Sequence, residues 1–149
     1  RKRGREKKQA SLTLYLSNPL TFSLSYPLTM KKCHKNLEVW KQSIKLVKII
    51  YTATNSLPPS EKYGLSSQMR RAAVSIPANI AEGAARQWEK ESVQFFTIAR
   101  GSLSELDTLI EICISLSFLS NPLTLSLLTS QINKVDILLS GLIRYKRRI

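Results

Sequence analysis

The sequence predicts an all-α protein, an antiparallel up-down four-helix bundle preceded by a flexible amino-terminal arm. Four stretches after residue 36 place apolar residues three and four positions apart, which is the spacing of one helix face. Short connections separate these stretches, and no segment alternates convincingly as a strand. The 149 residues contain only five glycines, and 43% are hydrophobic while 22% are charged. This composition and pattern indicate a helical bundle with a real core.

The first 29 residues differ in composition from the remainder. A basic run over residues 1–8 is followed by a segment rich in Ser, Thr, Leu and Pro, and Met30 then opens a stretch that looks like a natural start. We expect residues 1–29 to be a disordered extension or upstream sequence translated in frame, and residues 30–149 to be the bundle domain. A signal peptide is the alternative, but Pro19 and Pro27 interrupt the apolar part and no small-residue cleavage site follows.

The first helix is predicted from about Leu37 to about Asn55, and the pair Pro58 and Pro59 ends it firmly. Lysines occupy the face opposite its apolar residues. The predicted core stripe consists of Leu37, Trp40, Ile44, Val47 and Tyr51, with Val39, Leu46, Ile50 and Ala53 widening the face.

The second helix is predicted from about Ser66 to about Ala85 and carries Pro77 in its interior, where proline normally costs about 3 kcal/mol. Small residues, Gly83 among them, allow a neighbouring helix to approach closely. Its predicted core stripe is Leu65, Met69, Ala73, Ile76, Ile80 and Ala84. A separate polar stripe follows the helical spacing and contains Gln68, Arg71, Ser75, Asn79 and Glu82.

The polar stripe has two interpretations. It is either a solvated face or a contact between subunits or with a partner protein, in which Arg71 and Glu82 pair across the interface. In the second case Pro77 bends the helix to shape that surface; the alternative is a tolerated kink.

The third helix is predicted from about Glu89 to about Leu119, and a close helix contact would explain Gly101 within it. Its predicted core stripe is Phe96, Ala99, Leu103, Leu106, Ile110 and Cys113. The fourth helix is predicted from about Pro122 to about Tyr145, with Asn121 as its cap. Its predicted stripe is Leu125, Leu128, Ile132, Val135, Leu139 and Leu142.

A net charge of +13 and a pI near 10.1 favour an anionic partner, either nucleic acid or an acidic protein surface. For the lysines of the first helix the alternative is that they only keep the surface soluble. For the basic residues at the end of the fourth helix the alternative is that they complement the helix dipole. The candidate nucleic-acid contacts are Lys41, Lys45, Lys48, Arg70, Arg71, Arg86, Arg100, Arg144, Lys146, Arg147 and Arg148.

The residues that catalysis or metal binding requires are scarce. His34 is the only histidine, so the Glu-x-x-His pairs of di-iron bundles have no counterpart, and the glycines are too isolated to form a phosphate loop. Cys33 and Cys113 indicate neither a disulfide framework nor a zinc site. We therefore expect no enzyme, metal or cofactor. No membrane span is visible, and the cysteine usage fits a reducing cytoplasm.

Three segments, LEVWKQSIKLV, EKYGLSSQMRRAAVSIPANIAEGAAR and FFTIARGSLSELDTLIEI, resemble the four-helix-bundle proteins encoded by intervening sequences inside bacterial 23S ribosomal RNA genes. The resemblance covers about Leu37 to Arg147. It implies an antiparallel bundle that assembles into a ring-like homopentamer, without enzymatic activity. Relatives include the accessory protein of diversity-generating retroelements, which binds nucleic acid and a reverse transcriptase through a basic surface.

Two functions follow as hypotheses. The first is an oligomeric module that binds RNA, DNA or an RNA-containing complex through phosphates without base readout. The second is a protein-interaction scaffold or accessory subunit that makes no direct nucleic-acid contact and uses the polar stripe. The sequence also allows a third possibility, that the protein has no cellular duty beyond persistence of the element encoding it.

Overall fold

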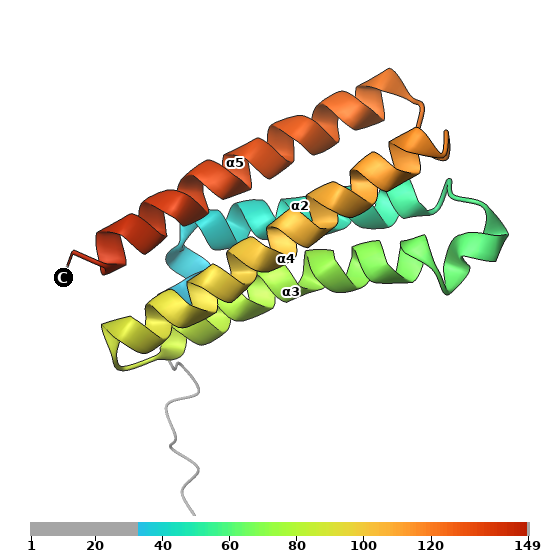
Figure 1. Cartoon of the computed structure of the whole chain (residues 1–149). Coiled ribbons are helices and arrows are strands. Elements are labelled where there is room, and N and C mark those ends of the chain that lie inside the picture. Colours follow the sequence, from blue (N-terminus) through green and yellow to red (C-terminus); the bar gives the residue numbers. More distant parts are fainter. Residues whose placement is uncertain (1–32, 149) are drawn as a thin grey trace, which may run out of the picture. The chain divides into compact units, whose positions relative to one another are not determined.

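The computed structural model describes residues 33–148, which form four long α-helices and two short 3₁₀ helices and contain no strand (Figure 1). The predicted all-α class is therefore confirmed, whereas the expectation for residues 1–29 lies outside the described residues. The elements are η1 (Cys33–Asn36), α2 (Glu38–Thr54), η2 (Pro59–Lys62), α3 (Leu65–Ala85), α4 (Glu89–Ser115) and α5 (Pro122–Lys146).

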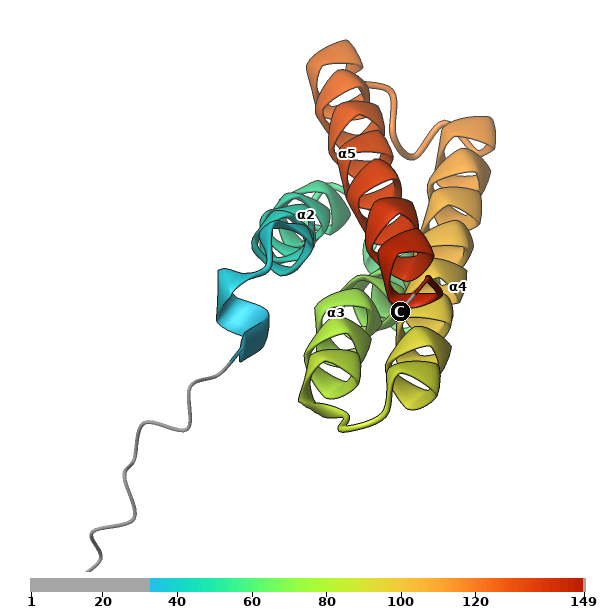
Figure 2. The same ribbon diagram turned by 90° about the vertical axis from the view of Figure 1, so that its left-hand side faces the viewer.

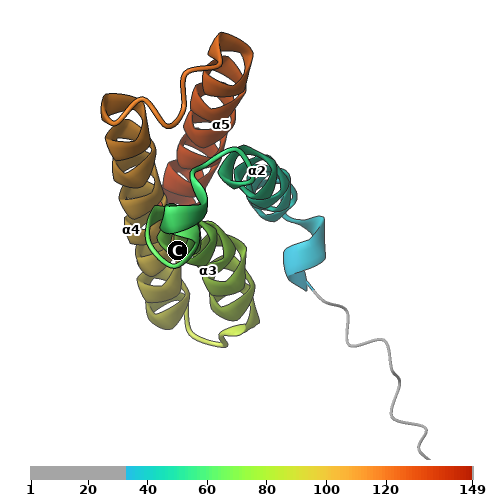
Figure 3. The same ribbon diagram turned by 90° about the vertical axis from the view of Figure 1, so that its right-hand side faces the viewer.

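The four long helices form an up-down bundle in which successive helices run in opposite directions. Helix α3 packs against α2 and α4, and α5 packs against the other sides of α2 and α4. Figure 2 views the end that holds the α3–α4 connection and the carboxyl end of α5. Figure 3 views the opposite end, which holds η2 and the α4–α5 connection. Short connections between antiparallel neighbours produce this arrangement.

The helix boundaries agree with the sequence to within one residue except at the end of α4. The predicted end near Leu119 is wrong, because α4 stops at Ser115 and Ser117 adopts a left-handed conformation with φ of 59°. Phe118 N donates to Cys113 O at 2.8 Å, and Ser117 N donates to Ile114 O at 2.9 Å. These bonds form a Schellman motif, which ends the helix and turns Leu119 back into the core.

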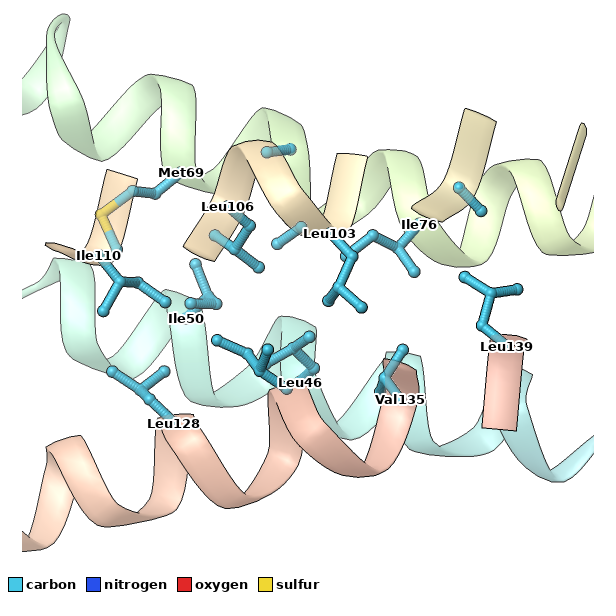
Figure 4. Packing of buried hydrophobic residues seen from close by; sticks show 14 of the residues in the cluster. Leu46, Ile50, Met69, Ile76, Leu103, Leu106, Ile110, Leu128, Val135 and Leu139 are labelled. Carbon is cyan, nitrogen blue, oxygen red and sulfur yellow. The ribbon is translucent and has the colours of Figure 1, made fainter. Parts of the chain in front are cut away.

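The core lies along the bundle axis between all four helices, as Figure 4 shows for its central residues. All six residues of the stripe predicted on α4 are buried, as are the middle four of the stripe on α3 and the middle four of that on α5. The outer members Leu65, Leu125 and Leu142 are partly buried. Helical periodicity therefore located these three faces correctly.

The apolar face predicted on α2 packs against the core, but its buried centre is formed by the residues expected only to widen it. Tyr51 is 44% exposed, and the other predicted members are only partly buried. The buried centre instead consists of Val39, Leu46, Ile50 and Ala53. The apolar face of α2 is broad, so its contacts with α3 and α5, rather than its own pattern, decide which residues point inward.

Two unusual residues of the sequence have different surroundings. Pro77 lies inside α3 and is buried there, so the helix continues through the proline as predicted. Gly101 is exposed on α4, and a Cβ atom built on it meets nothing within 4 Å. The close helix contact expected at Gly101 is therefore not made by any residue between 33 and 148.

Candidate nucleic-acid interface

The first group of candidate contacts lies on the outer side of α2. Lys41, Lys45 and Lys48 are exposed as predicted, and Lys134 of α5 lies near Glu38, as do Lys41 and Lys45. We call these four residues the lysine face. The structure places Lys134 there because α5 packs beside α2, with Gln131 Nε2 donating to the Gln42 carbonyl at 2.8 Å. The sequence alone carries no signal for this pairing.

The positive electrostatic potential of the lysine face acts on Glu38, whose pKa is lowered. The largest cause is a hydrogen bond from Gln42 Nε2 to Glu38 Oε1, at 2.6 Å. The ammonium groups of Lys41, Lys45 and Lys134 lower the pKa further, against the opposing effect of desolvation. One carboxylate is thus surrounded by several cations, so the face keeps a net positive charge.

The second group lies at the end of the bundle shown in Figure 2. Lys146 Nζ bonds to Glu89 Oε1 at 2.7 Å, which joins the carboxyl end of α5 to the first turn of α4. A hollow of about 320 Å³ beside this bond is lined by Glu89, Lys90, Val93, Lys146 and Arg147. Lys90, Lys146 and Arg147 line this hollow, and Arg86, Arg144 and Arg148 lie close to them along the chain. We call these cations the basic end: Arg86, Lys90, Arg144, Lys146, Arg147 and Arg148.

The basic end differs in two ways from the set of nucleic-acid contacts predicted from the sequence. It includes one residue that was not predicted, and one predicted residue is held by contacts within the chain. Lys90 was not predicted, since only the packing of α4 against α5 brings it beside Arg147. Arg86 is held in place, because it pairs with Glu82 one turn earlier and lies 4.5 Å from the ring centroid of Phe95. Lys90, Arg144, Arg147 and Arg148 form no ion pair with any residue between 33 and 148.

The structure separates Arg70 and Arg100 from both groups. Arg70 Nε donates to Thr54 Oγ1 at 2.8 Å, its terminal nitrogen donates to Asn55 Oδ1 at 3.0 Å, and its guanidinium lies over the ring of Tyr51. These contacts fasten the start of α3 to the end of α2, at the end opposite the basic end. Arg100 lies alone in the middle of α4 and is partly buried.

The predicted polar stripe contacts α4 of the same chain. Arg71 pairs with Glu105 at 3.2 Å, and the Ser75 and Ser102 hydroxyls lie 2.9 Å apart. Asn79 Nδ2 donates to the backbone oxygen of Ser75 at 2.8 Å and to its hydroxyl at 3.0 Å. The predicted partners Arg71 and Glu82 thus each have a different partner within the chain, while Gln68 remains exposed.

The residues with reactive side chains form no site within 33–148. No group of three His, Cys, Asp or Glu residues there is arranged to hold a metal ion. Cys113 is buried with its Sγ 3.6 Å from Met69 Sδ. Burial raises the pKa of its thiol, and the negative charge of Glu61 raises it further. None of the helices in the described part has the length and apolar character that crossing a bilayer requires.

A comparison with protein families agrees with this geometry. The profile of the family described as 23S rRNA-intervening sequence protein matches residues 35–141. The chain belongs to this family. The predicted resemblance is therefore confirmed, over a range that begins slightly earlier and ends earlier than expected. A search of curated proteins gives no match.

The range of the family match divides the candidate residues. All four residues of the lysine face lie inside it, and so do Arg86 and Lys90. The remaining members of the basic end, from Arg144 onward, follow the matched residues. Membership of the 23S rRNA-intervening sequence protein family thus supports the bundle and an RNA-related context. The candidate contacts from Arg144 onward have no support from the family match and depend on the structure of this chain alone.

Proposed function

We propose that this protein is a non-enzymatic, basic, oligomeric four-helix-bundle protein that associates with nucleic acid, either ribosomal RNA or an RNA-containing complex. The observation that carries the proposal is the basic end, where Lys90 of the first turn of α4 lines one hollow with Lys146 and Arg147 at the carboxyl end of α5. The family supports RNA as the partner class. An RNA partner of this kind implies the bacterial cytoplasm as the place of action.

Attraction between cations and phosphates dominates the proposed association. Exposed lysine and arginine side chains displace counterions from a polyanion, so the affinity falls steeply as salt increases. Contacts of this kind position the protein on the nucleic acid without reading its sequence. The lysine face and the basic end offer two such surfaces on one subunit, and oligomerisation multiplies them.

The test is fluorescence anisotropy with a labelled 23S rRNA fragment and an unrelated RNA of equal length. Between about 50 and 200 mM salt, we expect the affinity for both RNAs to fall about tenfold or more. Replacing Lys90, Arg144, Arg147 and Arg148 with glutamate should abolish most of the binding. Lys62→Glu, at the opposite end, is the matched control. Absence of binding at low salt, or affinity independent of salt, would contradict the proposal.

A homo-oligomer is part of the proposal, and the family resemblance suggests a pentamer. The outer sides of α3 and α4 support it, because they leave Val74, Ile98 and Ile112 between 39% and 45% exposed. Gly101 between the two isoleucines leaves room for a close neighbour. Native mass spectrometry measures the assembly directly, and a monomer mass at working concentration would refute it.

The second candidate function is a protein-interaction scaffold without direct nucleic-acid contact. The exposure of Gln68 and Arg71 beside the α3–α4 contact favours this candidate. If the polar stripe is an interface, Arg71→Glu should change the native mass or release the partner. The double variant R71E/E105R restores the pair within the chain and is the matched control. An unchanged mass in both variants would leave the stripe as solvated surface.

A further inference from the structure

We propose that Trp88 is a stacking platform for an unpaired base, so that the basic end takes a single-stranded segment of nucleic acid rather than a duplex. This inference rests on the proposed function, because it specifies the substrate class of the same basic end. It depends on one exposed aromatic ring that lies two residues from Arg86 and two residues from Lys90.

The side chain of Trp88 is 65% exposed, although its backbone is firmly placed. The residue caps the amino end of α4 with an extended backbone, φ −100° and ψ 131°. Its carbonyl accepts hydrogen bonds from Ser92 N at 3.0 Å and from Ser92 Oγ at 3.3 Å. A fixed backbone that carries an exposed ring presents that ring at little cost in conformational entropy.

Cations flank Trp88 from both neighbouring helices. Arg86 precedes it by two residues, and Lys90 follows it by two. Lys90 also lines the hollow that Arg147 of α5 borders. The end view in Figure 2 shows the α3–α4 connection and the end of α5 at the same end of the bundle. The first turn of α4 also carries Glu89, which pairs with Lys146, and Glu91. Phosphates on either side of a base stacked on Trp88 would therefore be held mainly by Lys90 and by the cations at the end of α5.

This combination of ring and charge selects single strands. Proteins that bind single-stranded nucleic acid combine a positive surface for the backbone with aromatic rings on which bases stack. In a duplex the bases are already stacked on each other, so their faces are not available to an external ring. Phosphate contacts alone do not require such a ring, which gives the exposed Trp88 a role beyond charge attraction.

An exposed tyrosine at the other end of the bundle provides a comparison. Tyr63 is 86% exposed, and Lys62 Nζ lies 5.4 Å from its ring centroid. Arg70, the predicted cation nearest to it along the chain, is bonded to Thr54 and Asn55 instead of being presented to solvent. Exposure of an aromatic ring is thus common to both ends, whereas Trp88 and not Tyr63 lies at the end that carries several outward cations.

The first experiment measures binding of Trp88→Ala to single-stranded RNA about 12 nucleotides long, to the same sequence in DNA, and to the corresponding RNA duplex. We expect the affinity for both single strands to fall about 5- to 100-fold, with a change of less than about twofold for the duplex. Trp88→Phe should retain most of the affinity, and Tyr63→Ala should retain all of it. A circular dichroism melt verifies that each variant is folded.

The second experiment uses the fluorescence of Trp88 itself. Trp40 is the only other tryptophan of the chain, so Trp40→Phe leaves Trp88 as the sole emitter. Addition of the single-stranded RNA should quench this emission, whereas inorganic polyphosphate, which has charge but no bases, should not. Equal single-strand affinity of Trp88→Ala and the wild type, or unquenched emission in the bound state, would overturn the inference.

Other outcomes separate this inference from the proposed function. If the wild type binds both RNA forms and Trp88→Ala binds them equally well, the stacking platform is refuted while phosphate association stands. If the wild type binds no RNA at low salt, the proposed function fails, and the platform fails with it. A lower native mass of Trp88→Ala, with RNA binding unchanged, would assign the ring to a protein contact instead.

Discussion

The backbone of Gly83 in α3 lies directly against the ring of Phe96 in α4. A Cβ atom on Gly83 would come within 2.6 Å of Phe96 Cε1 and 3.0 Å from the backbone oxygen of Ser92. Gly101, on the outer side of α4, has no such neighbour within 4 Å. The two glycines therefore serve different purposes, and replacing each with alanine should have opposite effects.

Gly83→Ala should destabilise the protein. Overpacking a core typically costs about 1–3 kcal/mol, and the better helix propensity of alanine offsets at most about 1 kcal/mol of it. We therefore expect the free energy of unfolding to decrease by about 1–2 kcal/mol, measured by denaturant titration. An unchanged or increased free energy of unfolding would show that the ring of Phe96 moves aside without cost.

Gly101→Ala should stabilise the folded chain by up to about 1 kcal/mol, because alanine is the better helix former and the new methyl group meets nothing within 4 Å in the part of the chain that the structure describes. Denaturant titration and native mass spectrometry are measured on the same sample. A fall in assembly mass would place Gly101 in a close contact between subunits. Loss of stability without a change in mass would contradict the open surroundings of this residue.

Asn121→Ala should weaken the start of α5. The Asn121 side-chain oxygen accepts from Leu123 N at 3.0 Å and from Thr124 N at 3.1 Å, which satisfies two donors that the helix leaves unpaired. Loss of a cap of this kind costs about 0.5–2 kcal/mol. Thermal melts should show the loss, and Asn121→Asp, which keeps the acceptor, should restore most of the stability. Equal melting of alanine and aspartate variants would contradict the capping role.

The two cysteines should differ in reactivity, and the buried one should make stability depend on pH. A thiol reagent should label the exposed Cys33 in the native protein and Cys113 only after unfolding. Because burial raises the pKa of Cys113 above its ordinary value of 9.0, the unfolded chain loses this proton first as the pH rises. The contribution of this buried thiol to the free energy of unfolding is therefore fully present below pH 9 and decreases as the pH rises above 9.

The control for this pH dependence is Cys113→Ala in a Cys33→Ser background. Removal of the buried thiol lowers stability at every pH by leaving a small cavity, but it should flatten the decline above pH 9 relative to Cys33→Ser alone. Parallel curves for the two variants would show that other groups cause the decline. Rapid labelling of Cys113 under native conditions would contradict its burial.

The sequence determined the features that depend on residues close together along the chain. Helical spacing identified four helices and the buried stripes of α3, α4 and α5, since a period of 3.6 residues is a local property. Asn121 and Pro122 marked the start of α5 for the same reason, because a cap bonds only to the next few residues. The sequence motifs of α3 and α4 were likewise sufficient to identify the family, because each motif is one continuous segment of the chain.

Only the tertiary structure decided which separate segments meet. The orientation of α2 depends on its contacts with α3 and α5, and the early end of α4 depends on a turn that returns Leu119 to the core. Lys134 joins the lysine face, and Lys90 joins the cations of α5, through helix pairs that no spacing specifies. Local periodicity indicates which side of a helix is apolar. The packing of several apolar sides against each other decides which residues of different helices become neighbours, and the proposed interface consists of such residues.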